Sequence, residues 1–299
     1  MTQQVGSRGA SQQASSTGSD SKTSGSSPKE WVRQEWIDAT HFHDLTEDEV
    51  LREVARRVAE VRAKAAGQHR QAHPLVLLDL DSTLYEVGPR THQILREWLA
   101  TEESRAFPSV CRALESLARG QVGYSLRDTF EAVGLDLADP ETAKAERLAK
   151  KFWAARFFQS EYLKYDHAYD GAARFAHELH RLGAEIVYLT GRDEPGMGDG
   201  TRARLKQDGF PWEQDRTHLL MKAAAELDDL EHKLAAGTYV REHGTLVASF
   251  ENEPPNLVAL YDQFPEAMHV FVDTVCSDRP ALAGRDLYRI KGFGFHAGE

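Results

Sequence analysis

Apolar residues in this chain gather in short continuous runs, which are separated by longer segments with helical spacing. A continuous apolar run without alternation fits a parallel strand that is buried on both faces. The first run covers residues 75–78, and later β-rich runs cover residues 184–192, 245–254 and 269–274. Because amphipathic segments lie between these runs, the sequence predicts a doubly wound, mostly parallel α/β core.

Residues 1–28 have a different composition from the rest of the chain. They consist mainly of Ser, Gln, Gly and Thr and contain hardly any aliphatic side chains. Such a segment cannot bury enough apolar surface to offset the entropy that it would lose on ordering. We therefore expect residues 1–28 to form a disordered tail.

Residues 29–73 predict a helical extension that packs onto the core. Thr46 and Glu49 spell a capping box, which marks the start of a helix over residues 46–66. The apolar stripe of this helix repeats at i, i+3/i+4 and consists of Val50, Leu51, Val54, Val58 and Val61. The aromatic residues that precede the helix, Trp31, Trp36 and Phe42, are expected to pack on the domain.

The first two strand runs lie about a hundred residues apart, far more than a single crossover helix requires. Most of residues 90–165 has the pattern of helices. Apolar stripes at helical spacing fall within residues 94–99, 110–117, 124–133 and 142–158, with Gly and Pro between them. The sequence thus predicts an all-helical insertion directly after the first strand.

The composition limits the possible partners. The chain has 299 residues and a net charge of −11, which argues against a broad nucleic-acid-binding face. No apolar run approaches the roughly 18 residues of a membrane span, and the N-terminus has no apolar signal region. Cys111 and Cys276 lie far apart without metal-ligand spacing, so we expect free thiols in a cytoplasmic protein.

Two carboxylates and a hydroxyl directly follow the first strand run: Asp79, Asp81 and Thr83. Open α/β sheets bind their ligands at the carboxyl ends of the strands, so both acids are expected at that edge. Two carboxylates one residue apart repel each other. A chain keeps them together at a buried edge mainly to hold a cation or to move protons.

Further polar groups follow the later runs. The second run contains Thr190 and Gly191, the third contains Glu251 and Glu253, and Lys222 and Lys233 lie between the two runs. The order is a strand with acids, a strand with Thr-Gly, a lysine, and a strand with acids. This order resembles the haloacid dehalogenase (HAD) superfamily of phosphohydrolases, over about residues 74–275.

The resemblance implies a Rossmann-like core of residues 74–89 and 166–299, with residues 90–165 as a helical C1-type cap. It also implies a Mg²⁺-dependent phosphatase that hydrolyses a small phosphorylated metabolite through an aspartyl-phosphate. Asp79 would be the nucleophile. Asp81 would be the general acid and base, and its main-chain carbonyl would ligate the metal.

The same resemblance assigns the phosphate-binding groups. Thr190 and the amide of Gly191 would bind the transferring phosphoryl oxygens, and Arg192 beside them would meet substrate charge or form a surface salt bridge. The lysine of the family usually sits at the start of the helix before the fourth motif. That position favours Lys233 over Lys222, and either ammonium would act as a point charge on phosphate and nucleophile.

The fourth motif departs from the family, whose members usually have aspartates where this chain has Glu251-Asn-Glu253. Glutamate is still an oxygen ligand for Mg²⁺, so we assign Glu251 as a metal ligand and Glu253 as a water-mediated ligand. Asp273, at the end of the fourth strand run, is a reserve candidate. The departure affects metal geometry and rate rather than the fold.

Three alternative functions use the same scaffold. A phosphotransferase, such as a sugar-phosphate mutase, would differ only in the acceptor that replaces water. A noncatalytic binding protein would explain the altered fourth motif, and a polynucleotide 3′-phosphatase is opposed by the acidic composition. The cap offers several aromatics and the arginines Arg90, Arg96, Arg112 and Arg127, but the sequence identifies neither substrate nor oligomeric state.

Overall fold

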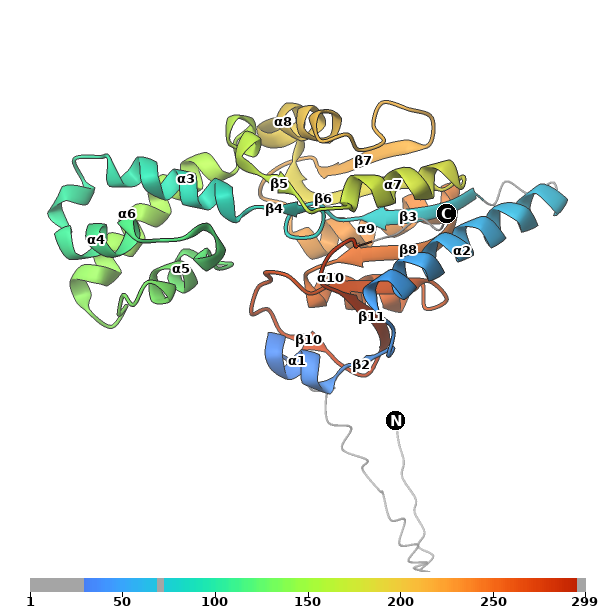
Figure 1. The fold of residues 1–299 in the computed structure, drawn as a ribbon, viewed down its shortest axis with the longest axis horizontal. Helices are drawn as coiled ribbons and strands as arrows, with labels where there is room; N and C mark the ends of the chain where they lie inside the picture. The colour runs from blue at the N-terminus through green and yellow to red at the C-terminus, as the bar shows by residue number, and fades with distance from the viewer. Residues whose placement is uncertain (1–29, 69–72, 295–299) are drawn as a thin grey trace, which may run out of the picture.

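The computed structural model describes residues 30–68 and 73–294, and its centre is a seven-stranded sheet (Figure 1). The strands lie in the order β2-β11-β9-β8-β3-β6-β7, and every neighbouring pair is parallel. Their bounds are β2 His41–Phe42, β3 His73–Leu78, β6 Glu185–Asp193, β7 Thr217–Lys222, β8 Gly244–Glu251, β9 Met268–Val272 and β11 Asp286–Ile290. The parallel α/β core is confirmed. The prediction for residues 1–28 lies outside the described residues.

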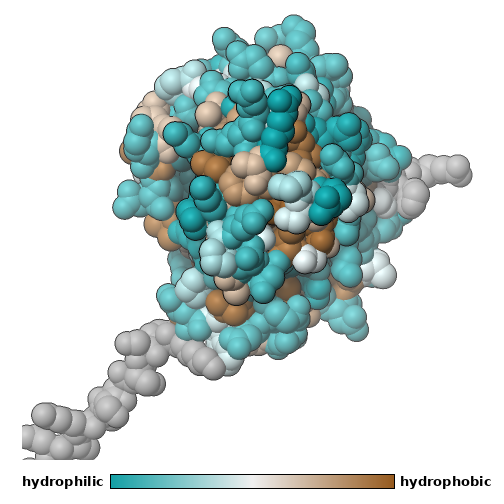
Figure 2. Space-filling view, turned by 90° about the vertical axis from the view of Figure 1, so that its left-hand side faces the viewer, coloured by the Kyte–Doolittle hydropathy of each residue, from teal (hydrophilic) through white to brown (hydrophobic). Residues whose placement is uncertain are grey.

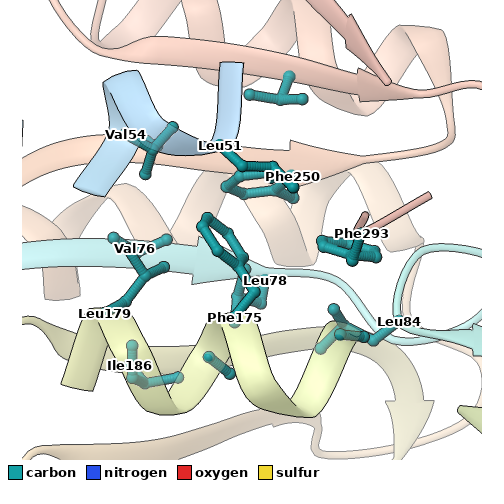
Figure 3. Packing of buried hydrophobic residues seen from close by; sticks show 14 of the residues in the cluster. Leu51, Val54, Val76, Leu78, Leu84, Phe175, Leu179, Ile186, Phe250 and Phe293 are labelled. Atoms are coloured by element: carbon teal, nitrogen blue, oxygen red, sulfur yellow. The ribbon is translucent and has the colours of Figure 1, made fainter. Parts of the chain in front are cut away.

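Helices cover both faces of the sheet. On one face lie α2 (Glu47–Gln68), α7 (Ala172–Arg181) and α8 (Glu194–Gln207), and on the other lie α9 (Asp229–His243) and α10 (Pro254–Gln263). Strand β3 serves both layers because its side chains alternate. Val76 and Leu78 pack with Phe175 in the first layer (Figure 3), whereas Leu75 and Leu77 pack with Val240 in the second.

Helix α2 begins where the capping box predicts. The backbone N–H of Thr46 donates to Glu49 Oε2 at 2.8 Å, and the backbone N–H of Glu49 donates to Thr46 Oγ1 at 3.4 Å. These two bonds satisfy donors that the first helical turn cannot pair. Four of the five predicted stripe residues are fully buried, namely Val50, Leu51, Val54 and Val58.

A helical insertion, residues 88–165, projects from the carboxyl end of the sheet at the left of Figure 1. It contains α3 (Gly88–Leu99), α4 (Pro108–Glu115), α5 (Leu126–Ala132) and α6 (Pro140–Phe157), with short 3₁₀ turns η1 (Ser104–Ala106), η2 (Arg119–Gln121) and η3 (Ser160–Tyr165). The insertion has its own apolar core, which includes Trp98 and Phe130. At its base, β4 (Tyr85–Glu86) pairs antiparallel with β5 (His167–Ala168).

The far edge of the sheet contains elements that the sequence pattern does not predict. Strands β2 and β11 extend the sheet beyond β9, and β1 (Glu30–Trp31) pairs with β10 (Ala281–Leu282). The short helix α1 (Arg33–Ala39) buries Trp36 completely, and its ring lies edge-on to Phe271 at 5.1 Å. The expectation that the N-terminal aromatics pack on the domain is thus confirmed for Trp36.

Within residues 30–68 and 73–294, no helix combines the length and the apolar character that crossing a bilayer requires.

Candidate active site

A cleft of about 370 Å³ lies between the carboxyl ends of β3, β6 and β8 and the helical insertion. Its lining includes Asp79, Asp81, Thr190, Gly191, Arg192, Lys233, Glu251 and Glu253, whereas Thr83, Lys222 and Asp273 are not part of it. Because parallel strands all end at one edge of the sheet, residues far apart in sequence meet there.

The turn after β3 aims the two aspartates into this cleft. Ser82 has a positive φ of 60°, an uncommon conformation for a side-chain-bearing residue, and its N–H donates to the carbonyl of Tyr85 at 2.7 Å. The next residue, Thr83, donates from its hydroxyl to Asn252 Oδ1 at 3.1 Å. This bond ties the turn to the residue that follows β8, so Thr83 supports the loop.

Lys233 lies between two buried carboxylates, and we call Asp79, Lys233 and Glu251 the lysine cluster. The ammonium donates to Asp79 Oδ1 at 2.6 Å and also to Glu251 Oε2. Exposure of the three residues is 6 % for Asp79, 2 % for Lys233 and 1 % for Glu251. The cluster therefore contains two carboxylates and one ammonium, shielded from water.

This imbalance shifts the protonation equilibria of the cluster. Burial raises the pKa of Asp79, although the charge of Lys233 opposes the rise. Burial and the nearby charge of Asp79 also raise the pKa of Glu251, to about 8. Burial would lower the pKa of Lys233, but its two carboxylate partners raise it above the ordinary value. The site thus favours a positive charge and carries more negative charge than Lys233 can balance.

Asp81 belongs to a second ion cluster, which we call the arginine cluster and which also contains Arg90, Asp166 and Arg192. Arg90 Nη2 and Arg192 Nε donate to Asp81 Oδ1 at 3.1 and 3.0 Å. The same guanidiniums hold Asp166, with Arg90 Nε at 2.8 Å from Oδ1 and Arg192 Nη2 at 2.9 Å from Oδ2. Two cations thus face two carboxylates.

The balanced charges of this cluster stabilise the ionised form of Asp81. Burial alone would raise the pKa of Asp81, but the charges of Arg192 and Arg90 outweigh it and lower the pKa to about 2. Arg192 is only 2 % exposed. The structure contains an interior ion pair in place of the surface salt bridge considered for Arg192, and a contact with substrate charge stays a prediction because Arg192 also lines the cleft.

Thr190 and Gly191 lie on β6 at the floor of the cleft. Thr190 is almost fully buried, and its Oγ1 accepts a hydrogen bond from the N–H of Arg192 at 3.2 Å. A side chain at Gly191 would bring its Cβ to 2.7 Å from Asp229 Oδ2. A larger residue at this position would therefore require the Asp229 side chain to move.

Glu253 faces away from the lysine cluster. Its carboxylate accepts hydrogen bonds from the Ser277 N–H at 2.9 Å and the Ser277 hydroxyl at 2.5 Å, in the loop after β9. Burial raises the pKa of Glu253, and these bonds to Ser277 oppose the rise. The side chain is therefore held by the loop and not by the neighbouring Glu251.

The four predicted metal-ligating residues are not gathered around one point. In the part of the chain that the structure describes, no three His, Cys, Asp or Glu side chains are arranged to hold a metal ion. Asp79 and Glu251 do face each other across Lys233. Two carboxylates with one ammonium form a donor set of excess negative charge and hard oxygen ligands, which fits a divalent cation such as Mg²⁺.

The other lysine and the reserve aspartate lie outside the cleft lining. Lys222 ends β7 and donates to the carbonyls of Ala225 and Leu227 and to Asp229 Oδ1, at 3.1, 2.9 and 2.8 Å. Asp273 pairs with Arg33 and Arg289 near the sheet edge. Lys222 and Asp273 therefore stabilise neighbouring loops and strands.

Asp166 was not predicted as part of the site, and Arg90 was predicted only as one of the arginines of the cap. Both side chains are fully buried, and they lie 76 positions apart in the chain. No local pattern marks Asp166, which follows η3 in a polar stretch. The run of polar residues at Glu251-Asn252-Glu253 did contain a usable signal for Asn252, whose side chain joins Thr83 to the Val275 carbonyl.

The chain is similar to a known protein family over part of its length. Residues 73–209 match the family described as haloacid dehalogenase-like hydrolase. No curated protein sequence matches the chain.

Several solved structures are similar to the chain at low sequence identity. A putative phosphatase from Clostridium difficile is 13 % identical with a TM-score of 0.40, over 68 % of this chain and 86 % of that one. Protein Tyrosine Kinase A from Mycobacterium tuberculosis is 15 % identical with a TM-score of 0.39, over 72 % and 93 %. The putative HAD-hydrolase YfnB from Bacillus subtilis, bound to magnesium, is 15 % identical with a TM-score of 0.36, over 74 % and 95 %.

Proposed function

We propose that this chain, whose residues 73–209 match the haloacid dehalogenase-like hydrolase family, hydrolyses the phosphate monoester of a small molecule through a phosphorylated Asp79. The observation that carries the proposal is the buried ammonium of Lys233 between Asp79 and Glu251. A carboxylate held beside a fixed positive charge is suited to attack phosphorus, because the ammonium offsets the repulsion between two anions.

The first half of the proposed reaction transfers the phosphoryl group to the enzyme. A carboxylate oxygen of Asp79 forms a bond to phosphorus while the bond from phosphorus to the leaving oxygen breaks. The hydroxyl of Thr190 and the N–H of Gly191 donate to the phosphoryl oxygens, and Lys233 balances their charge. Asp81 enters this step protonated and gives its proton to the leaving oxygen, so binding of the substrate has to offset the two arginine charges that otherwise keep Asp81 ionised.

In the second half, water attacks the phosphorus of the aspartyl-phosphate. Asp81 takes the proton from this water, phosphate leaves, and the carboxylate of Asp79 is restored. Both proton transfers are proposed at Asp81 Oδ2, because the guanidiniums of Arg90 and Arg192 donate to Oδ1 in the structure.

A divalent cation fits the same site. Asp79 and Glu251 would hold Mg²⁺, which would neutralise charge on the transferring phosphoryl group. The main-chain carbonyl of Asp81 and a water-mediated contact to Glu253 remain predictions for the rest of its coordination. The helical insertion is proposed as the C1-type cap, and the cleft of about 370 Å³ favours a small substrate. A cytoplasmic location also remains a prediction.

One observation favours the alternative of a noncatalytic binding protein. Two arginines donate to Asp81 Oδ1 and lower the pKa of its carboxyl to about 2, which opposes a role as an acid, and Glu253 is held by Ser277. Such a protein would keep the cleft and bind a phosphorylated molecule without turning it over.

The test measures phosphate release from p-nitrophenyl phosphate and a panel of small phosphate esters, with and without Mg²⁺. We expect Asp79→Asn to lower kcat at least about 10³-fold, because the amide is a poor nucleophile. Asp199→Asn is the matched control, since the Asp199 side chain is fully exposed on α8, and it should stay within about twofold of wild type.

Equal rates for Asp79→Asn and wild type would overturn the proposed nucleophile. If neither protein released phosphate but both bound orthophosphate, the noncatalytic reading would replace the enzymatic one.

A further inference from the structure

The wall of the cleft that the helical insertion supplies is aromatic. Trp153 and Phe157 lie in the last turns of α6, Phe158 follows that helix, and all three line the cleft. We call these three residues the aromatic wall. The same cleft is lined from the sheet by Asp79, Lys233 and Thr190. The cleft therefore combines ionic groups for a phosphate with aromatic surface for the rest of a substrate.

The aromatic wall is held in a fixed geometry. Trp153 stacks on Phe157 with ring centroids 4.3 Å apart, and Phe158 lies edge-on to both at 5.7 and 5.1 Å. The indole N–H of Trp153 donates to Thr91 Oγ1 at 3.0 Å. The guanidinium of Arg90 lies 4.2 Å from the centroid of Phe157, so the wall is also attached to the arginine cluster.

The three aromatic side chains of the wall are more exposed than the aromatic side chains in the core of the insertion. The insertion buries Trp98 and Phe130 completely in its own core, whereas Trp153 and Phe157 are only partly buried and Phe158 is 45 % exposed. Figure 2 views the molecule from the side of the insertion and shows hydrophobic surface within a mostly hydrophilic face. Exposed aromatic area that lines a concave site is typical of ligand binding.

We propose that the substrate is a small phosphate monoester whose alcohol carries an aromatic ring, with the ring packed against Trp153 and Phe158. This inference rests on the proposed function, because the phosphate must reach Asp79 and Lys233. Rings that meet face to face with an offset, or edge to face, gain affinity beyond that of the apolar area they bury. Only a flat substrate group gains this additional affinity by packing against the rigid indole of Trp153.

The experiment compares three esters that separate ring binding from leaving-group chemistry. Benzyl phosphate and allyl phosphate release alcohols of similar acidity, and only the first has a ring. Cyclohexylmethyl phosphate has a ring of similar size that is not flat. We expect the KM for benzyl phosphate to be about tenfold lower than for allyl phosphate, with cyclohexylmethyl phosphate between them.

Substitutions in the wall test which residues supply the preference. Trp153→Leu and Phe158→Ala should each raise the KM for benzyl phosphate by about fivefold to tenfold and leave the KM for allyl phosphate within about twofold. The Phe158→Ala variant is expected to fold normally, because the Phe158 side chain is already exposed. Phe152→Leu is the matched control, since Phe152 is the neighbouring aromatic of α6, contacts Arg156 and does not line the cleft.

Equal KM values for the three esters, or wall variants that raise both KM values alike, would overturn the aromatic preference while the proposed hydrolysis stands. Calorimetry measures the affinity for benzylphosphonate and allylphosphonate, which cannot be hydrolysed. It tests the aromatic preference even if the protein hydrolyses no ester. If no ester is hydrolysed but benzylphosphonate binds about tenfold more tightly and Trp153→Leu removes the difference, the aromatic inference stands and the proposed hydrolysis fails.

Discussion

Two ion clusters lie at the cleft and differ in their balance of charge. The lysine cluster has two carboxylates, Asp79 and Glu251, for one ammonium. The arginine cluster has two carboxylates, Asp81 and Asp166, for two guanidiniums. The pKa values move in opposite directions: Glu251 is raised to about 8, mainly by burial, whereas at Asp81 the arginine charges outweigh burial and lower it to about 2.

The comparison teaches that burial alone does not decide how a carboxylate behaves. In both clusters burial raises the pKa, and the number of facing cations determines the net result. A carboxylate with unmet charge is suited to bind a cation or a reaction partner, while one whose charge is met keeps its ionised form.

The arginine cluster also connects parts of the molecule. Arg90 belongs to α3 of the insertion, Asp166 follows η3, and Arg192 lies on β6 of the sheet. Its ion pairs thus fasten the base of the insertion to the core, beside the cleft that lies between them.

The largest effect on stability is expected from breaking the balanced cluster. In Asp166→Asn, two buried guanidiniums would face only Asp81, so the free energy of unfolding should fall by about 3–5 kcal/mol. Urea denaturation measures the change, with Asp199→Asn as the exposed control. A loss below about 1 kcal/mol would show that the cluster does not support the fold as described.

The same type of substitution in the unbalanced cluster should behave differently. Glu251→Gln removes the repulsion with Asp79 and leaves Lys233 a partner, so without Mg²⁺ the free energy of unfolding should stay within about 1 kcal/mol of wild type. Mg²⁺ should raise the Tm of wild type but not of the variant. Thermal unfolding with and without MgCl₂ measures both, with the exposed Glu231→Gln as control.

An equal Mg²⁺-dependent shift in Glu251→Gln and wild type would contradict the role of Glu251. A loss of stability in Glu251→Gln as large as that in Asp166→Asn would remove the contrast between the clusters.

A third buried group, His269, also makes stability depend on pH, and its contribution can be separated from those of the two clusters. His269 accepts the Ser249 hydroxyl at 2.7 Å on Nδ1 and donates from Nε2 to the Phe264 carbonyl at 2.9 Å, and burial lowers its pKa from 6.5 to about 4. The unfolded state therefore binds the proton more readily. Stability should be complete above about pH 6.5 and fall by about 3 kcal/mol as the pH drops through 4.

Denaturation of wild type and His269→Gln across this pH range separates the histidine from the two clusters. The variant should lose less stability between about pH 6.5 and 4 than wild type does. Parallel curves would assign the acid sensitivity to other groups.

The smallest effect is expected at Ser82, which lies between Asp81 and Thr83. Its φ of 60° costs a serine more than a glycine, so Ser82→Gly should keep or raise the free energy of unfolding, by at most about 1 kcal/mol. Ser82→Val should lower it, because a branched side chain disfavours this conformation. The reverse order in chemical denaturation would contradict strain at this turn.

The sequence predicted the parts of the fold that have strong local patterns. The continuous apolar runs at β3, β6, β8 and β9 identify buried parallel strands, and the capping box identifies α2. Since the carboxyl ends of parallel strands share one edge, the predicted Asp79, Lys233 and Glu251 are found together there.

The parts that the sequence did not predict depend on long-range contacts. Strand β2 has two residues and no periodicity, and β11 carries polar residues within its short span. The orientation of Glu253 is set by Ser277, and the burial of Arg90 by Asp166, so neither follows from the neighbouring residues.

The central claim is that Asp79, in the unbalanced cluster, receives the phosphoryl group. The most direct measurement is the mass of the Asp79-containing peptide after rapid acid quenching of Asp81→Asn during turnover of p-nitrophenyl phosphate, since this variant should slow water attack. We predict a mass increase of one phosphoryl group on that peptide and none in Asp79→Asn. Turnover with the phosphoryl group on another residue, or undiminished turnover in Asp79→Asn, would contradict the account.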